Sequence, residues 1–402
     1  MENPKIRFKG FTKDWEQRKL GDVIDDMYNG QTPSRNKSEY WNGTIKWLSS
    51  GELNRGTVYD SIETITEEGQ KAANLKIVPK GTFVMAITGL EAAGTRGNCA
   101  LLGFDTTLNQ SCMALFPKQE MLTSEFLFQW YRKVGEEYGI NYTQGTKQQS
   151  YNAELIKILP ISLPSVVEQR KISSYLSHLD HLITLHQRKC DQTKNLKKYM
   201  LQKMFPQNGA KVPKIRFDGY TYDWEQRKLG DVFKEYSEKN HTELSALTII
   251  QGGGTVKRED SDRNLMYDTS NLSNYKMVRK DDFIVHLRSF EGGLEKSSLD
   301  GIISPAYHTF HSDMADSRFY YPYFRSYEFI KHKLVPHVYG IRDGRSIDID
   351  GMKTIEIPYT SIEEQRKIGD YLDCLDHLIT LHQRKCDELK KMKKYMLQNM
   401  FI

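Results

Sequence analysis

The segment EQRKISSYLSHLDHLITLHQRKCDQTKNLKKYMLQKMF (residues 168–205) returns as EQRKIGDYLDCLDHLITLHQRKCDELKKMKKYMLQNMF (residues 364–401), with 29 of 38 positions identical. In both copies apolar or semi-apolar residues recur at alternating steps of four and three, the spacing of a heptad seam. A helix of about 40 residues would be roughly 60 Å long and cannot bury so narrow a seam alone. The seam residues are Ile172, Leu176, Leu179, Ile183, His186, Cys190 and the polar Thr193 in the first copy, and Ile368, Leu372, Leu375, Ile379, His382, Cys386 and Leu389 in the second.

Each predicted helix needs a packing partner, which is either its own domain or the other copy. We favour an antiparallel coiled coil between the two copies, because each offers a matching seam in the same chain. Ser165 and Ser361 precede Glu168 and Glu364 by three residues, which predicts a capping box at each start. The two seam histidines are expected to be hydrogen-bonded core residues and not metal ligands.

A shorter repeat precedes each half of the chain. PKIRFKGFTKDWEQRKLGDV (residues 4–23) matches PKIRFDGYTYDWEQRKLGDV (residues 213–232) at 17 of 20 positions, whereas the segments 24–167 and 233–363 do not align over most of their length. Age alone would blur all parts of a duplication equally. The chain therefore has two halves that share the repeated segments, called the frame below, and differ in the segments between them.

In the variable segments, loop signals separate short predicted strands and helices, as in mixed α/β structure. Short β-like runs at residues 81–89 and 281–290 are followed by helix-like stretches at 123–139 and 318–334, and then by polar loops at 141–152 and 337–348. The predicted fold is α+β, with two pseudo-twofold-related α/β domains joined by two long helices. Its predicted parts are a first domain (1–164), a central helix (165–208), a second domain (209–360) and a C-terminal helix (361–402).

The composition restricts the class of protein. The 402 residues are 38% hydrophobic and 27% charged, with a net charge of +5, which permits nucleic-acid binding without requiring it. The start of the chain has no apolar signal region and no stretch approaches 18 apolar residues, so we expect neither secretion nor membrane spanning. Five scattered cysteines fit a reducing cytoplasm and predict neither a zinc site nor a disulfide frame.

The polar loops supply side chains that can contact DNA, with Arg or Lys suited to guanine and Asn or Gln to adenine. Ordinary solvated loops remain the alternative, and the tryptophans at 41 and 47 are expected in the core. The candidates in the first domain are Arg35, Lys37, Lys46, Ser49, Ser50, Thr95, Arg96, Asn98, Asn109, Gln110, Thr143, Gln144, Thr146, Lys147 and Gln148. Those in the second are Gln251, Lys257, Arg258, His286, Arg288, Ser289, Arg342, Arg345 and Ser346.

Signatures of catalysis are missing from the sequence. It has neither the tetrapeptide nor the glycine motif of the S-adenosylmethionine-dependent amino-methyltransferases, and no recognisable nuclease cluster of carboxylates. GLEAAGTR (residues 89–96) has the glycine spacing of a phosphate-binding loop but lacks its lysine. We therefore expect no catalytic site, no metal site and no cofactor in this chain.

The layout resembles the specificity subunits of type I restriction–modification enzymes over essentially the whole chain. The resemblance rests on the WEQRKLGDV starts, on QTPSRNKSEYWNGTIKWLSSGELN (residues 31–54), and on a proline shortly before EQRKI at both helix entries. It implies two target recognition domains, each reading one half of a bipartite, asymmetric DNA site. The second domain lacks the TPS…YW…W-x-SS cluster of the first, so its half-site should differ.

The resemblance also implies partners. Two methyltransferase subunits, which bind S-adenosylmethionine, would dock on the chain, and translocase–nuclease subunits, which use ATP and magnesium, would join them. EQRK occurs four times at domain-to-frame junctions, and Arg18 and Arg227 are the candidate docking residues. Three other classes remain open: a self-contained DNA-modifying enzyme, a coiled-coil scaffold and a stand-alone DNA-binding regulator.

Overall fold

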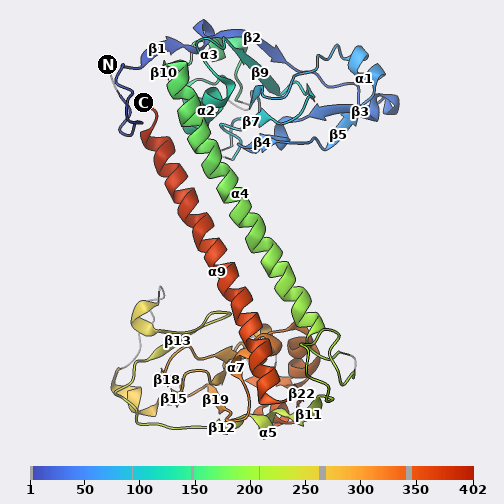
Figure 1. Cartoon of the computed structure of the whole chain (residues 1–402), viewed down its shortest axis with the longest axis vertical. Coiled ribbons are helices and arrows are strands. Elements are labelled where there is room, and N and C mark those ends of the chain that lie inside the picture. The colour runs from blue at the N-terminus through green and yellow to red at the C-terminus, as the bar shows by residue number, and fades with distance from the viewer. Residues whose placement is uncertain (1–2, 93, 146–148, 208, 262–268, 341–345) are drawn as a thin grey trace. The chain divides into compact units, whose positions relative to one another are not determined.

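The computed structural model describes residues 3–92, 94–145, 149–207, 209–261, 269–340 and 346–402. The chain divides into two compact units, the first made of Met1–His186 with Arg384–Ile402 and the second of Gln187–Gln383. Each unit contains one mixed domain and a stretch of both long helices, so the mixed α/β domains and the two long helices predicted from the sequence are confirmed (Figure 1). The units divide each long helix and do not leave the helices as separate parts.

The first unit is built on a five-stranded sheet with the order β2-β9-β6-β7-β4, in which β6 pairs antiparallel with both neighbours. A three-stranded sheet (β5-β3-β8) and the pair β1-β10 complete its strands. The strands are β1 (Glu16–Lys19), β2 (Ile24–Asn29), β3 (Trp41–Leu48), β4 (Thr57–Val58), β5 (Glu63–Ile65), β6 (Phe83–Ala86), β7 (Cys99–Leu102), β8 (Thr107–Leu108), β9 (Cys112–Pro117) and β10 (Pro160–Leu163). The helices of this unit's domain are α1 (Glu67–Ala72), α2 (Ser124–Asn141) and α3 (Ala153–Lys157), with short turns η1 (Leu20–Asp22), η2 (Ser38–Tyr40) and η3 (Ser50–Glu52).

The second unit has a four-stranded antiparallel sheet with the order β12-β19-β16-β17, and four two-stranded pairs. Its strands are β11 (Glu225–Lys228), β12 (Lys234–Tyr236), β13 (Leu247–Ile250), β14 (Gly254–Lys257), β15 (Lys276–Val278), β16 (Phe283–Val285), β17 (Glu295–Lys296), β18 (Gly301–Ile303), β19 (His308–His311), β20 (Val338–Tyr339), β21 (Ser346–Ile347) and β22 (Glu356–Tyr359). Its helices and turns are α5 (Leu229–Val232), η4 (Arg258–Asp260), η5 (Thr269–Asn274), α6 (Ser289–Gly292), α7 (Ser317–Phe324), η6 (Glu328–Leu334), η7 (Val335–His337) and α8 (Ile349–Lys353).

The helix-like stretch predicted at residues 318–334 is two helices and not one. The helix α7 ends at Phe324 and contains Pro322, and the π-helical turn η6 follows it. Pro322 lacks the N–H that would bond to the carbonyl one turn earlier and its ring crowds that turn, so it weakens α7, although the helix continues past it to Phe324. The corresponding stretch of the first unit has no proline and forms the single 18-residue helix α2.

The two long helices are α4 (Val166–Lys203) and α9 (Ile362–Asn399), of 38 residues each. In the first unit, contacts of α4 with α9 pair Asp180 with Lys393 and Ile183 with Cys386, so the two stretches run antiparallel. In the second unit, Lys197 donates to Asp376 at 2.5 and 2.6 Å. Of the predicted seam, Ile172, Leu176, Leu179, Cys190, Ile368, Leu372, Leu375, Cys386 and Leu389 are buried.

Both alternatives for the packing partner hold for different parts of the seam. Its first turns join the core of the domain that the helix follows, as Ile172, Leu176 and Leu179 do in the first unit. Further along, the helices contact each other through side chains such as Cys190, whose thiol lies 3.8 Å from the Ile379 carbonyl. Ile183 and Ile379 are half-buried.

The ends of the long helices fill the domain cores. Phe401, two residues after α9, packs on Trp15 and Phe126 with ring centroids 6.3 and 5.3 Å away. Phe205, two residues after α4, packs in the same way on Trp224 and Phe319, at 6.0 and 4.8 Å. The tryptophan of each DWEQRK copy and the phenylalanine that ends each long repeat are therefore contact partners.

The glutamate of each helix entry is buried in an ion pair. Glu168 accepts from Arg7 at 2.7 and 2.8 Å, and Glu364 accepts from Arg216 at the same two distances, while both glutamates are 1% exposed. The predicted capping boxes are therefore half formed. Ser165 and Ser361 accept from the backbone of the glutamates, but the carboxylates bind arginine in place of the helix start.

The neighbouring glutamines attach each helix to its domain. Gln169 accepts from the backbone N–H of Thr123 at 3.0 Å, and Gln365 accepts from that of Asp316 at 3.0 Å. Thr123 and Asp316 are the N-caps of α2 and α7. Both glutamines have no exposed surface, so their bonds to the domain are shielded from water.

The Arg7 and Arg216 pairs give a test of stability. Arg7→Met should lower the free energy of unfolding by about 3 to 5 kcal/mol, because it leaves the carboxylate of Glu168 buried without a counter-charge. Arg216→Met should cost less, since Glu364 keeps hydrogen bonds from the Trp224 indole and the Thr360 hydroxyl. Chemical denaturation followed by tryptophan fluorescence measures both. The control is Arg18→Met, which breaks an exposed pair with Glu16 and should leave the free energy of unfolding almost unchanged; equal losses in all three variants would contradict the assignment.

Candidate nucleic-acid interface

In the first unit the predicted polar loops leave the sheet at the end of β6. Because β6 is antiparallel to β7 and β9, its end at Ala86 lies beside the starts of those strands and the end of β2. The backbone of Ala86 donates to the Asn98 carbonyl, and that of Ile87 donates to Ser111, each at 2.9 Å. The Ile87 carbonyl in turn accepts from Tyr151 at 2.8 Å. Loops from three distant parts of the sequence therefore meet at this edge.

Two further loops reach the same edge. The backbone of Gln31 donates to Leu108 at 3.0 Å, and that of Asn109 donates to Leu48 at 2.9 Å. The side chains of Thr32 and Gln110 are hydrogen-bonded to each other. The edge thus brings together the predicted residues Ser49, Ser50, Thr95, Arg96, Asn98, Asn109, Gln110, Thr143 and Gln144; Thr146, Lys147 and Gln148 lie outside the described residues.

Arg55, which the sequence analysis missed, organises the loop at 95–98. Its backbone φ of 59° is in the left-handed region that residues other than glycine rarely adopt. The guanidinium donates to the Asn98 side chain at 3.2 Å and to the carbonyl of Arg96. Arg96 itself donates to the carbonyls of Leu90 and Glu91. Arg96 and Asn98 therefore have structural bonds within the edge, and no sequence pattern indicates Arg55.

The predicted cations on β3 and before it are neutralised by nearby carboxylates. Arg35 donates to Glu63 at 2.5 and 2.9 Å and lies 3.8 Å from the centre of the Trp41 ring. Lys46 pairs with Asp60 at 2.6 Å. The hydrogen bond from Arg35 lowers the pKa of Glu63 below its ordinary value. Trp47 is 2% exposed in a small core of its own, which confirms its predicted place.

Lys37 has a different setting from those two cations. Its ammonium donates to the hydroxyl of Tyr40 at 3.0 Å and lies 4.9 Å from the centre of that ring. The hydrogen bond to Tyr40 raises the pKa of Lys37. The lysine is exposed, so its positive charge remains available for a phosphate.

In the second unit the corresponding edge is at the end of β16. His286 to Arg288 follow this strand directly, and Tyr307 precedes its antiparallel neighbour β19. Gln251 comes to the same edge in the turn between β13 and β14. That turn is held by the buried carboxylate of Glu295, which accepts from the backbone of Gly252 at 2.7 Å and of Gly254 at 3.3 Å.

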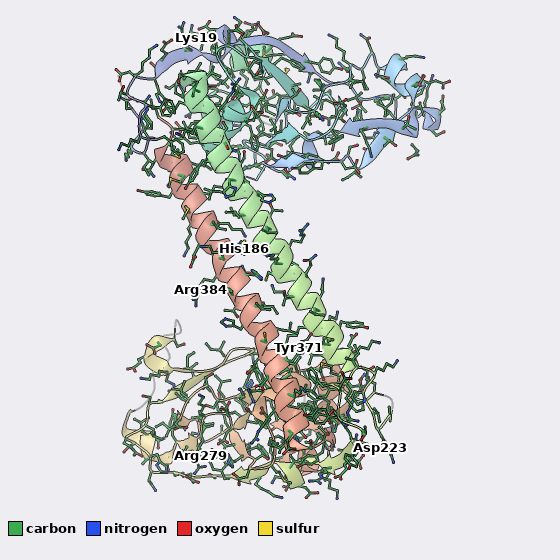
Figure 2. All side chains as sticks on the ribbon, viewed as in Figure 1. Lys19, His186, Asp223, Arg279, Tyr371 and Arg384 are labelled. Atoms are coloured by element: carbon green, nitrogen blue, oxygen red, sulfur yellow. The ribbon has the colours of Figure 1, made fainter. Side chains whose placement is uncertain are left out.

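Glu295 is itself balanced by charge and hydrogen bonds. It has no exposed surface, and it binds the guanidinium of Arg325 and the hydroxyl of Tyr321. Arg279 of the same domain, labelled in Figure 2, pairs with Glu238 at 2.8 Å. Neither Glu295 nor Arg325 was singled out from the sequence, because a lone Glu and a lone Arg carry no pattern.

Ser289 is a correction to the predicted set. It has no exposed surface, and its hydroxyl accepts from the backbone of His286 at 2.9 Å, so in this structure it shapes the loop and cannot touch a ligand. Lys257 is exposed and Arg258 is half-buried beside Tyr275. Ser346 pairs with Tyr339 between β20 and β21, and Arg342 and Arg345 lie outside the described residues.

The described residues also bear on membrane-spanning segments and metal sites. None of their helices is long and apolar enough to cross a membrane. In the same residues, no group of three or more His, Cys, Asp or Glu side chains is placed to hold a metal ion.

Two unlike domains on a repeated frame, each with polar loops at one sheet edge, define a protein of the DNA-sequence-recognition class. Comparison with known proteins names the family. The chain belongs to the type I restriction–modification specificity family, because the model of the "Type I restriction modification DNA specificity domain" matches residues 12–195 and 222–391.

Individual relatives agree with this family. The type I restriction enzyme MjaVIII specificity subunit of Methanocaldococcus jannaschii is 24% identical over 96% of this chain and 91% of its own length. The MjaIX specificity subunit of the same organism is 30% identical, over 57% of this chain and 54% of its own length. The crystal structure of a type I restriction–modification S subunit from M. genitalium covers 100% of this chain and 99% of its own, with a TM-score of 0.62 and 15% identity, and so shares the fold.

The Arg35–Glu63 pair can be tested by DNA binding. Arg35→Gln should weaken binding of the purified chain to duplexes of any sequence, because it leaves the carboxylate of Glu63 without its counter-charge near the phosphates. Glu63→Gln should strengthen binding, because it releases Arg35 from its carboxylate. Fluorescence anisotropy over a salt series measures both. The control is Lys71→Gln, which removes the same charge from α1, where Lys71 pairs with Glu67. An equal loss of DNA affinity in this variant would show a non-specific effect of net charge.

Proposed function

We propose that each domain of this specificity subunit reads one half of a bipartite, asymmetric DNA site, and that the chain directs adenine methylation without a catalytic site of its own. The observation that carries this is the convergence of polar loops at the end of β6 in one domain and of β16 in the other. The two edges present different side chains, so the two half-sites should differ. The scattered cysteines support a cytoplasmic location for this proposed function.

The partners follow from the family. Two methyltransferase subunits supply S-adenosylmethionine-dependent chemistry, and translocase–nuclease subunits supply ATP- and magnesium-dependent restriction. The subunit itself contributes double-stranded DNA recognition. Lys and Arg side chains provide affinity through phosphates, and the loop edges provide specificity through bases.

The two long helices set the spacing between the half-sites. Each has 38 residues, which corresponds to about 57 Å at 1.5 Å per residue. In this proposal they pair along the seam as an antiparallel coiled coil. Two domains on one face of B-DNA need a separation of about one helical turn, roughly 34 to 36 Å, which helices of this length can span.

Sequencing of methyladenine in cells that carry this chain and its partner subunits tests the function. The wild type should give one motif with two defined halves and an unread spacer. A variant with one extra turn of about four residues in both helices should keep both halves and lengthen the spacer by one or two base pairs, since the turn adds about 6 Å. Variants with the turn in a surface loop at Gly10 and Gly219 serve as controls and should not change it. An unaltered spacer in the helix variant would refute the spacing role.

The strands β1 and β11 form matched faces for the methyltransferase subunits. Both read EQRK, and both pair antiparallel with the strand that precedes a long helix. Arg18 donates to Glu16 at 2.9 Å and Arg227 to Glu225 at 2.8 Å. The faces are not identical, because Arg227 also lies 3.8 Å from the centre of the Tyr359 ring.

Charge reversal tests these faces. Arg18→Glu and Arg227→Glu, made singly, should each release one methyltransferase subunit, and the double variant should release both, because like charges then meet at the contact. Native mass spectrometry of the assembled complex counts the subunits. Lys13→Glu, next to the same strand, is the matched control of charge. A change in the DNA motif with full assembly would mean that these arginines read DNA instead.

A further inference from the structure

The second domain has a hollow of about 600 Å³ at the edge where β16 ends. It is bordered by Thr248 on β13, Gln251 in the turn that follows, His286 and Arg288 after β16, and Tyr307 before β19. Five side chains from three separate segments thus surround one space. Gln251 and Arg288 are exposed, so the hollow opens beside a flexible amide and a positive charge.

Two polar atoms of this lining have no hydrogen-bond partner among the described residues. They are the Thr248 hydroxyl oxygen and the Nε2 of His286, and neither is accessible to water. Thr248 is 7% exposed. A buried polar group without a partner costs about 1 to 3 kcal/mol, and valine would have the same shape as threonine without that cost. The hydroxyl therefore has no structural use in the free chain.

The structure determines which ring nitrogen of His286 carries the proton. Its Nδ1 accepts from the backbone N–H of Arg288 at 3.3 Å, so a neutral ring must bear its proton on Nε2. Burial lowers the pKa of His286 below its ordinary value, which keeps the ring neutral at pH 7. His286 is therefore a fixed hydrogen-bond donor, and the guanidinium of Arg288 is a second donor on the same border.

Residues outside the hollow also hold its border in place. Glu295 holds the backbone of the turn that carries Gln251, and the Gln251 amide packs against Gly292 of α6, where a Cβ would lie 2.1 Å from Nε2. Ser289 anchors the backbone of His286. Two polar atoms that folding leaves unpaired, on a border held in this way, are hydrogen-bonding capacity that a reading site can use.

We propose that this hollow is the base-reading site of the second domain, and that it receives a guanine edge in the major groove of the DNA. The proposal rests on the proposed function and adds to it the residues and the base. Guanine presents two acceptors there, N7 and O6, whereas adenine presents one acceptor and one donor. The donors of His286 and Arg288 match the former pattern. Local rotation exposes the Thr248 hydroxyl and the Nε2 of His286 to the base, which then satisfies both atoms.

The test uses the full chain with its partner subunits and sequencing of methyladenine. Thr248→Val and His286→Phe each remove one polar group with little change in volume. Each should lower discrimination at one guanine position of a single half-site by about tenfold or more, while the other half-site and the spacer stay unchanged. Thermal denaturation should show Thr248→Val to be as stable as the wild type or more stable. A structural role would instead lower stability and leave the motif alone.

The outcomes separate the two proposals. A wild-type motif with both halves and variants that read it unchanged would overturn the assignment of the hollow and leave the proposed function intact. Complete absence of a methylated motif in the wild type would overturn both. If His286→Phe does not fold, Thr248→Val decides alone, and Arg288→Gln, at an exposed position, should relax the same half-site. Relaxation of the opposite half-site would also contradict the assignment.

Discussion

The burial of one phenylalanine against one tryptophan holds each unit together. Phe401 reaches Trp15 in the first unit, and Phe205 reaches Trp224 in the second. Each pair joins the end of a long helix to the strand that opens a domain. An aromatic contact of this kind adds about 0.5 to 1.5 kcal/mol to the area that it buries. Because the helix end completes the domain core, the tryptophan and the phenylalanine cannot change freely, and both recur in the two repeats.

The same constraint extends along the helices through charge. Asp180 and Lys393 pair in the first unit, and Asp376 and Lys197, their equivalents in the repeat, pair in the second. Arg132 of α2 adds a second cation to Asp180 at 2.6 Å, whereas burial raises the pKa of this carboxyl above its ordinary value. A charge that is partly buried is stabilised only when its partners stay in place. These pairs therefore fix the register of α4 against α9 within each unit.

The repeated frame was predicted well because each of its segments occurs twice, and such a repeat can be recognised in a single sequence. Heptad spacing located both long helices, and the buried seam residues from Ile172 to Leu389 confirm that prediction. The glutamates of EQRK were assigned to capping boxes, since the motif is local in sequence. Their actual partners, Arg7 and Arg216, are 161 and 148 residues away. A contact of that range has no signature in a single sequence, and so the capping prediction was half right.

The candidate interface was predicted less well, for a physical reason. Composition identified the loops, and the topology of β6 and β16 brings most of them to one edge in each domain. Composition could not distinguish a polar side chain that already has a hydrogen-bond partner within the protein from one that does not. Arg96 and Ser289 are satisfied by their own loops, while Thr248, which no motif marked, is buried and has no partner among the residues that the structure describes. The hydrogen-bonding capacity that folding leaves unused can therefore be identified only once every internal bond of the described residues is assigned.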